Sequence, residues 1–295
     1  MRILALHGRG SNTQIFTAQL SPLAAHLPDI QFDHLQGTVR HTEGNWSLHT
    51  TAFSRLPLYT YYNPLDPRSI LQTETELEAL IARDGPFDGV LGYSGGAALA
   101  AEILCRDVAR NPLGLVSQRP FRFAVFINGA SPLRVFRLDE VDVDPSVEFD
   151  ADSLVEEARS MFLRPSALRR KEGVSVEDQA DHEVMLGMLE RCRGMVLRDG
   201  TKFISDGEFG LCRFERRRDD GDDEGEALID VPTLHVRSIE EDETNPHHGL
   251  HLLSLCDRDK AREFHHEYGH DFPRGRVEMM KIAQLIRETA EASVQ

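Results

Sequence analysis

The feature that most constrains this chain is a strand-length run that is apolar on both faces. The segment FRFAVFINGA at 121–130 shows no alternation of apolar and polar residues. A continuous apolar run of this length is typical of a strand in a parallel sheet that is covered on both sides. The segment at 69–85 has leucine and isoleucine on one side and Glu or Thr on the other, which is the pattern of an amphipathic helix. Strands that alternate with such helices predict a doubly wound α/β fold with a mostly parallel sheet.

The same alternation extends over most of the 295 residues. We expect strands at 2–6, 30–37, 87–94, 121–130, 231–238 and within 261–270, and helices at 13–27, 69–85, 95–111 and 277–292. Between 131 and 215 the alternation stops, and helical patterns occupy 150–162 and 176–197. We therefore predict a core at 1–130 and 227–295. The segment 131–226 is predicted to be a cap-like helical insertion plus an acidic loop, near the carboxyl ends of the strands, where ligands bind in such sheets.

Charge and apolar content exclude several partners. The formal net charge is −16, whereas nucleic acids and anionic membranes select basic surfaces, so we expect neither as a partner. No apolar run approaches the roughly 20 residues that span a membrane, and no signal-peptide pattern opens the chain. The four cysteines are scattered without a Cys-x-x-Cys pair, so we expect a cytoplasmic location.

The segment GYSGG at 92–96 lies where the predicted strand at 87–94 becomes the helix at 95–111. Glycines two residues to either side of Ser94, Gly92 and Gly96, permit a tight turn that would hold its hydroxyl above the sheet. The amino end of the following helix would favour negative charge that develops there. Gly-x-Ser-x-Gly in this context is typical of the nucleophile elbow of α/β-hydrolases. It predicts that fold, with Ser94 as nucleophile; a plain turn of small residues is the alternative.

A nucleophilic serine needs a histidine base, and the histidine needs an acid that fixes its tautomer. In this fold the chain order is serine, acid, histidine. His270 follows the last predicted strand, and Gly269 gives its loop conformational freedom. Four acidic residues, 240–243, follow the strand at 231–238. We favour Asp242 as the acid and keep Glu241 as the alternative, the remainder being a solvated loop.

Backbone N–H groups must stabilise the oxyanion of an acyl-transfer reaction. One donor is expected from Gly95, directly after the nucleophile. The second is expected from the loop after the first strand, where Gly8 lets the backbone approach closely and Arg9 or Ser11 donates. In the alternative interpretation, Arg9 is simply solvated.

Together these segments resemble the fungal FSH family of small serine hydrolases, in particular the thioesterases that act beside polyketide synthases. The resemblance is carried by RILALHGRGSNTQIF (2–16), GPFDGVLGYSGGAALA (85–100), VPTLHVRSIEED (231–242) and YGHDFPR (268–274). It implies roles for Ser94 as nucleophile, His270 as base and residue 241 or 242 as acid. Two positions depart from the family pattern: Gly95 replaces a common Gln, and Ser238 replaces a Gly. The family's spacing points to Glu241 as the acid.

The expected reaction is hydrolysis of an acyl thioester or ester through an acyl-serine, with no metal and no organic cofactor. The resemblance implies a thioesterase that releases a polyketide acyl chain from the acyl carrier protein of a synthase in fungal secondary metabolism. The basic cluster at 164–171 is interpreted as a solvated helix face, with a docking surface for that carrier protein as the alternative. A broad carboxylesterase on short oxygen esters and a non-catalytic acyl-binding module are the alternatives. Apolar residues that are candidates for an acyl pocket, with plain core packing as the alternative, are Tyr93, Met161, Phe162, Met185 and Met188.

Overall fold

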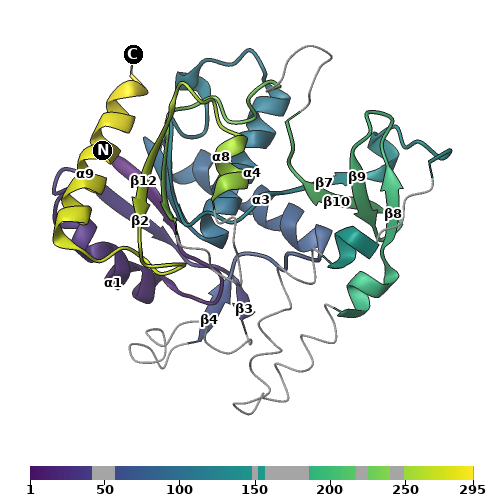
Figure 1. The fold of residues 1–295 in the computed structure, drawn as a ribbon, viewed down its shortest axis with the longest axis horizontal. Coiled ribbons are helices and arrows are strands. Elements are labelled where there is room, and N and C mark those ends of the chain that lie inside the picture. Colours follow the sequence, from purple (N-terminus) through teal and green to yellow (C-terminus); the bar gives the residue numbers. More distant parts are fainter. Residues whose placement is uncertain (42–56, 148–151, 157–185, 217–224, 240–248, 295) are drawn as a thin grey trace.

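A six-stranded, fully parallel sheet forms the centre of the computed structural model, which describes residues 1–41, 57–147, 152–156, 186–216, 225–239 and 249–294. The strand order is β12-β11-β6-β5-β1-β2 (Figure 1). Because neighbours in this order are not consecutive in sequence, the connections cross over the sheet, which confirms the predicted doubly wound α/β topology. The strands are β1 (Arg2–Leu6), β2 (Gln31–Leu35), β5 (Gly89–Tyr93), β6 (Phe123–Ile127), β11 (Thr233–Ser238) and β12 (Ala261–His266).

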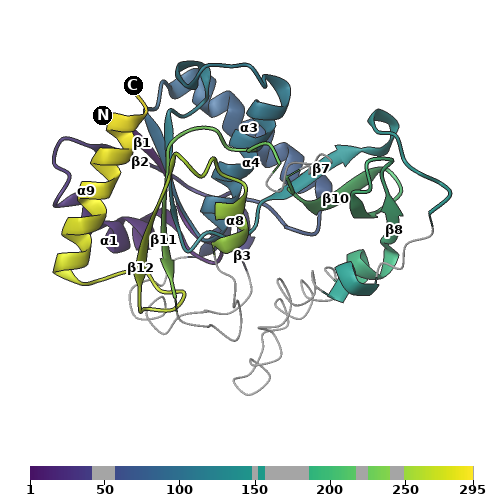
Figure 2. The same ribbon diagram turned by 45° about the horizontal axis from the view of Figure 1, so that its top comes forward.

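Helices cover both faces of this sheet. Figures 1 and 2 show α1 (Thr13–Ala24) and α9 (Arg276–Ala292) on one face, and α3 (Pro67–Asp84) and α4 (Gly95–Arg110) on the other. Local signals set the helix ends: the Asn12 side chain accepts from the Ile15 N–H at the start of α1. The shorter helices are α8 (Leu250–Ser254) and the 3₁₀ turns η1 (Val116–Gln118) and η2 (Leu138–Glu140).

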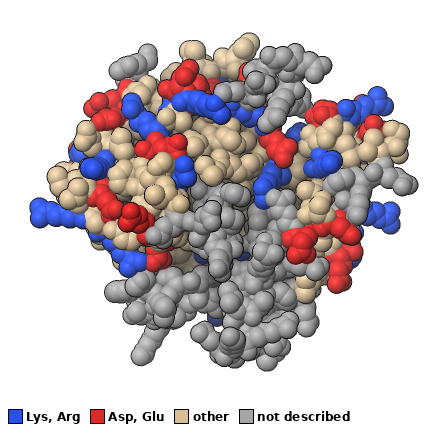
Figure 3. Space-filling view, in the orientation of Figure 1, with Lys and Arg blue, Asp and Glu red and all other residues tan. Residues whose placement is uncertain are grey.

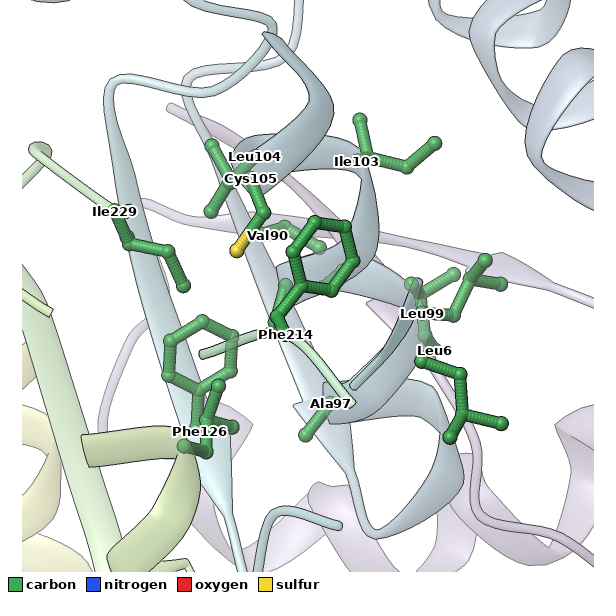
Figure 4. Packing of buried hydrophobic residues seen from close by; sticks show 14 of the residues in the cluster. Leu6, Val90, Ala97, Leu99, Ile103, Leu104, Cys105, Phe126, Phe214 and Ile229 are labelled. Atoms are coloured by element: carbon green, nitrogen blue, oxygen red, sulfur yellow. The ribbon is translucent and has the colours of Figure 1, made fainter. Parts of the chain in front are cut away.

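The core has two parts, because successive strand side chains point to opposite faces of the sheet. In β1, Ile3 and Ala5 pack with residues of α1 and α9, whereas Leu4 and Leu6 pack with residues of α3 and α4. Figure 4 shows the second part, in which side chains of α4 lie against the sheet residues Leu6, Val90 and Phe126. This burial on both faces is why β6 is apolar along its whole length.

The segment after β6 builds a second, antiparallel sheet. Its strand order is β7-β10-β9-β8, with β7 (Leu133–Arg137), β8 (Arg193–Val196), β9 (Lys202–Ser205) and β10 (Phe209–Arg213). The sheet extends to one side of the core in Figures 1 and 2. Phe214, directly after β10, packs into the core cluster with Ala97 and Phe126, which ties the sheet to the core (Figure 4).

The sequence analysis was wrong about part of this segment. It predicted a helix over 176–197, but the described helical residues end at 191 and β8 follows. A turn at Asp199-Gly200, with Gly200 at a φ of 85°, connects β8 to β9, and the hairpin pairing supplies hydrogen bonds that local helical periodicity cannot reveal. Of the pattern at 150–162, residues 152–156 are described and are helical. The division into core and cap-like insertion remains a prediction.

Two further strands, β3 (Val39–His41) and β4 (Leu58–Thr60), form a small antiparallel pair beside the loop after β1. Among the described residues, no helix has the length and apolar character needed to cross a membrane. On the face shown in Figure 3, the described acidic and basic side chains are interspersed. The basic cluster at 164–171 lies outside the described residues.

Candidate active site

Ser94 lies at the sharp turn between β5 and α4. Its φ of 52° and ψ of −116° are strained for a residue with a Cβ. Backbone hydrogen bonds hold this conformation: the Ser94 N–H donates to the Ile127 carbonyl at 2.9 Å, and the Ser94 carbonyl accepts from the Ala130 N–H at 3.2 Å. The turn therefore has the geometry predicted for a nucleophile elbow.

The flanking glycines have a steric cause. A Cβ on Gly92 would lie 2.5 Å from the backbone of Ala97, and a Cβ on Gly96 would lie 2.4 Å from the Leu6 carbonyl oxygen. Both distances are shorter than van der Waals contact with backbone that cannot move aside. A Cβ on Gly95 would meet nothing closer than the Arg9 backbone nitrogen at 3.5 Å, an ordinary contact. The motif thus needs Gly92 and Gly96, whereas position 95 has room for a side chain.

His270 lies against Ser94, although 176 residues separate them in sequence. The distance from His270 Nε2 to Ser94 Oγ is 3.1 Å, within hydrogen-bond range. The loop that carries His270 follows β12 at the carboxyl edge of the sheet, and Gly269 takes a φ of 56° there. The structure therefore brings together the two residues that the sequence analysis assigned as nucleophile and base.

Tyr93 contacts His270 through both its hydroxyl and its ring. Its hydroxyl donates to the His270 carbonyl at 2.6 Å, and its ring stacks on the imidazole with centroids 5.6 Å apart. The ring also packs against Phe16 and Phe272 of the core. Tyr93 therefore holds the backbone and the ring of His270, a contact that the acyl-pocket prediction missed. Met188 packs against the main core cluster, while Met161, Phe162 and Met185 lie outside the described residues.

The loop after β1 borders Ser94. A Cβ on Gly8 would lie 3.4 Å from Ser94 Cβ, and the Arg9 backbone nitrogen lies beside Gly95. The Ser11 N–H donates to the Tyr59 carbonyl at 3.2 Å and is already paired. Ser11 therefore does not serve as a free oxyanion donor, a correction to one of the two loop donors predicted. The Gly95 and Arg9 amides remain the candidate pair.

His7 holds this loop in place. Its Nε2 accepts from the Gly37 N–H at 3.0 Å, so Nδ1 carries the hydrogen and donates to the Gly8 carbonyl at 2.8 Å. The ring stacks on Tyr61, whose hydroxyl accepts from the His7 N–H. Burial in this site lowers the pKa of His7 from 6.5 to about 4. His7 is therefore a neutral, structural histidine at the base of the candidate oxyanion loop.

The two candidate acids, Asp242 and Glu241, lie outside the described residues. The chain enters that segment from Ser238, the last residue of β11, at the same edge of the sheet as His270. Within the described ranges, no group of three or more His, Cys, Asp or Glu side chains is arranged to hold a metal ion.

Comparison with known families agrees with this geometry. A model of the family described as "Serine hydrolase (FSH1)" matches residues 1–182, which include the loop after β1 and the turn at Ser94. The chain belongs to this family. The resemblance inferred from the sequence is thus confirmed. The parallel sheet and the nucleophile elbow identify the fold as that of an α/β-hydrolase, and the protein is a hydrolytic enzyme.

Its curated relatives are fungal hydrolases and esterases. Hydrolase FUB4 of Fusarium oxysporum f. sp. lycopersici is 28% identical over 294 residues, covering 98% of both chains. Hydrolase phiM of a fungal species is 38% identical over 138 residues, 46% of this chain and 59% of the relative. Esterase alnB of Emericella nidulans is 24% identical, with 92% of this chain and 90% of the relative covered.

Among solved structures, a monoacylglycerol lipase of Paleococcus ferrophilus matches 99% of this chain and 94% of its own length. The TM-score is 0.47 and the sequence identity 9%.

Proposed function

We propose that Ser94 and His270 are the nucleophile and base of an acyl hydrolase whose triad is completed by Asp242 or Glu241. The observation that carries the proposal is the 3.1 Å contact between His270 Nε2 and Ser94 Oγ at a strained strand-to-helix turn. The carboxyl edge of a parallel sheet is also where ligands bind in α/β folds. The names of the relatives, hydrolases and esterases, favour an ester or thioester substrate.

In the proposed mechanism, His270 Nε2 accepts the Ser94 proton as Oγ attacks the acyl carbonyl carbon. The Gly95 and Arg9 amides stabilise the oxyanion, a contribution of roughly 3–4 kcal/mol for one such donor. When the carbonyl re-forms, the C–S or C–O bond breaks and His270 gives its proton to the leaving thiol or alcohol. His270 then takes a proton from water as the water attacks the acyl-serine, and returns it to Ser94 Oγ. The steps use no metal and no cofactor.

We propose a thioester, delivered by the acyl carrier protein of a synthase in the cytoplasm, as the substrate. This choice rests on the resemblance to polyketide-pathway thioesterases. A broad carboxylesterase is the second candidate, favoured by the name of the esterase from Emericella nidulans. The basic cluster at 164–171 stays the predicted docking surface for the carrier protein.

The first test is labelling with a fluorophosphonate probe, followed by hydrolysis of matched acyl thioesters and oxygen esters of several chain lengths. We expect wild type to be labelled, and Ser94→Ala and His270→Ala to lose at least about a hundredfold in rate. Labelling that persists in Ser94→Ala would exclude Ser94 as the nucleophile. Faster turnover of long thioesters supports the thioesterase, whereas a preference for short oxygen esters supports the carboxylesterase.

The acid is assigned by a matched pair of variants, Asp242→Asn and Glu241→Gln. The triad acid orients the histidine and stabilises the imidazolium, so its amide variant loses far more of kcat than the amide variant of its neighbour. Equal, small losses in both variants would place the acid elsewhere.

A further inference from the structure

Asn128 is a buried polar residue at the carboxyl end of β6, between the elbow and the His270 loop. Its side chain is fully buried, and its φ of 44° is one that Asn tolerates better than most residues. The side-chain amide Nδ2 donates to the carbonyls of His270 at 3.1 Å and Asp271 at 3.0 Å. Oδ1 accepts from the Ser238 N–H at 3.2 Å and bonds His266 Nε2 at 3.1 Å.

These four contacts use the whole hydrogen-bonding capacity of the amide. Nδ2 has two hydrogens and faces two carbonyl oxygens, while Oδ1 has two lone pairs and faces two nitrogens. A flipped amide would place oxygen against both carbonyls, so the network fixes the orientation of Asn128. It also fixes the tautomer of His266: Nε2 carries the hydrogen, and Nδ1 accepts from the Tyr268 N–H at 3.2 Å.

Neighbours of Asn128 in the chain hold the other member of the site. The Ile127 carbonyl accepts from the Ser94 N–H, and the Ala130 N–H donates to the Ser94 carbonyl. The segment 127–130 thus contacts the backbone of Ser94 directly and the backbone of His270 through the Asn128 side chain. Both reacting side chains are therefore positioned by one short, buried stretch of chain.

We propose that Asn128 is a positioning residue for the catalytic base, which it acts on through the backbone carbonyls of His270 and Asp271. This inference rests on the proposed roles of Ser94 and His270. The His270 carbonyl accepts from Tyr93 as well as from Asn128, so the backbone that carries the imidazole is held by two donors. A displacement of about 1 Å between reacting groups costs on the order of a hundredfold in rate, which gives such a restraint catalytic weight.

Asn128 also holds the strand that leads to the candidate acids. Ser238, whose N–H it binds, ends β11 and lies two residues before the segment 240–248. The Asn128 N–H donates to the Val236 carbonyl of the same strand at 2.8 Å. The Asn128 residue, directly after β6, therefore connects the carboxyl ends of β6, β11 and β12 through its side chain.

The test compares Asn128→Asp with wild type in kinetics and in hydrogen–deuterium exchange of residues 267–274. Asp keeps the shape and tolerates the positive φ, but its carboxylate presents oxygen to both carbonyls. We expect kcat to fall about 10- to 100-fold with KM changed less than about twofold, and exchange of 267–274 to become faster. Asn63→Asp, at a residue whose Oδ1 caps a turn at Leu65, is the matched control and should behave as wild type.

A folded Asn128→Asp protein with kcat within about twofold of wild type and unchanged exchange at 267–274 would overturn the proposal. Asn128→Gly, which also tolerates the positive φ, is the second variant. If neither Asn128→Asp nor Asn128→Gly folds, the residue is needed for folding, and a role limited to positioning is overturned. If no fluorophosphonate labels the wild-type protein, the proposed function is overturned, but the restraint of the His270 loop by Asn128 is not. Faster exchange at 267–274 in the variant would still support the restraint on the loop.

Discussion

At the scale of single residues, Gly96 and its neighbour Gly95 differ in what a Cβ would contact in the Ser94 turn. Gly96 packs against the carbonyls of Leu6 and His7, so the first turn of α4 lies directly on the end of β1. Gly95 has no such neighbour, although it belongs to the same motif. The turn therefore contains one glycine that is required by packing next to one that is not.

We expect Gly96→Ala to lower the rate of fluorophosphonate labelling by about tenfold or more and to destabilise the protein by about 1–3 kcal/mol. The added methyl would overlap two carbonyl oxygens and push α4, with Ser94, away from β1. Labelling kinetics and thermal unfolding measure the two effects.

Gly95→Ala is the control for this change, because its Cβ would lie at ordinary contact distance from Arg9. It should label at a rate within about threefold of wild type. Equal damage from the two alanine variants would contradict the steric explanation.

At the scale of elements, a buried carboxyl on α4 connects three parts of the chain. Glu102 is fully buried, and its Oε1 accepts from the Tyr62 hydroxyl and from the Leu133 N–H, both at 2.8 Å. Leu133 begins β7, the first strand of the antiparallel sheet. Burial and the nearby Glu74 carboxyl raise the pKa of Glu102. The helix that follows Ser94 therefore also holds the start of the second sheet.

Glu102→Gln should keep both hydrogen bonds, because the amide has an oxygen at the same place. A raised folded-state pKa means that wild type loses stability as pH rises above the unfolded value near 4.5. Since Gln does not titrate, we expect Glu102→Gln to gain stability relative to wild type as pH rises from 5 to 8. Chemical denaturation at several pH values measures the difference.

Glu102→Ala is the contrasting variant, since it leaves the Leu133 N–H and the Tyr62 hydroxyl without their acceptor. Buried donors without partners and the cavity together should cost about 2–5 kcal/mol at neutral pH. A Glu102→Gln protein as unstable as Glu102→Ala would show that the hydrogen bonds are not what holds β7 to α4.

At the scale of the whole molecule, buried histidines and buried carboxyls make the free energy of unfolding depend on pH in opposite directions. His7, His235 and His266 are almost completely buried, and burial lowers their pKa values to about 4, 3 and 4. Burial raises the pKa of the Glu74 and Glu102 carboxyls. The Glu78 carboxylate raises the pKa of Glu74 further, and the Glu74 carboxylate raises that of Glu102. Stability contributed by the histidines is present above pH 6.5 and is lost as pH falls toward 4, whereas that of the two carboxyls is lost as pH rises above 4.5.

We therefore expect the free energy of unfolding to pass through a maximum near pH 6.5. Each net proton difference contributes a slope of up to about 1.4 kcal/mol per pH unit. His235→Asn should flatten the acid side of the curve, because the unfolded chain then binds one proton fewer between pH 3 and 6.5. Equilibrium denaturation between pH 4.5 and 8 records the curve.

Stability that rises steadily from pH 5 to pH 8 in wild type would rule out the influence of the buried carboxyls.

Local pattern in the sequence was enough for the central sheet, its helices and the residues Ser94 and His270. Strands apolar on both faces, amphipathic helices and a glycine-flanked serine are properties of neighbouring residues, and the physical causes act over a few positions. The loop after β1 was predictable for the same reason, and the structure places Gly8 where a Cβ would lie 2.9 Å from the Tyr93 ring and 3.4 Å from the Ser94 Cβ.

Only the tertiary structure decided the features that join distant segments. The strands β8, β9 and β10 form through pairing across hairpins, so the helical periodicity was misleading at 192–197, where β8 lies. The Ser11 N–H donates a hydrogen bond to the carbonyl of Tyr59, which lies 48 residues later in the chain. Asn128 and Tyr93 meet the His270 loop through contacts more than 140 residues apart, and hydrogen bonds of that range leave no periodic signal. Sequence alone thus predicted Ser94 and His270 as the reacting pair, and tertiary packing decided what holds these two residues in place.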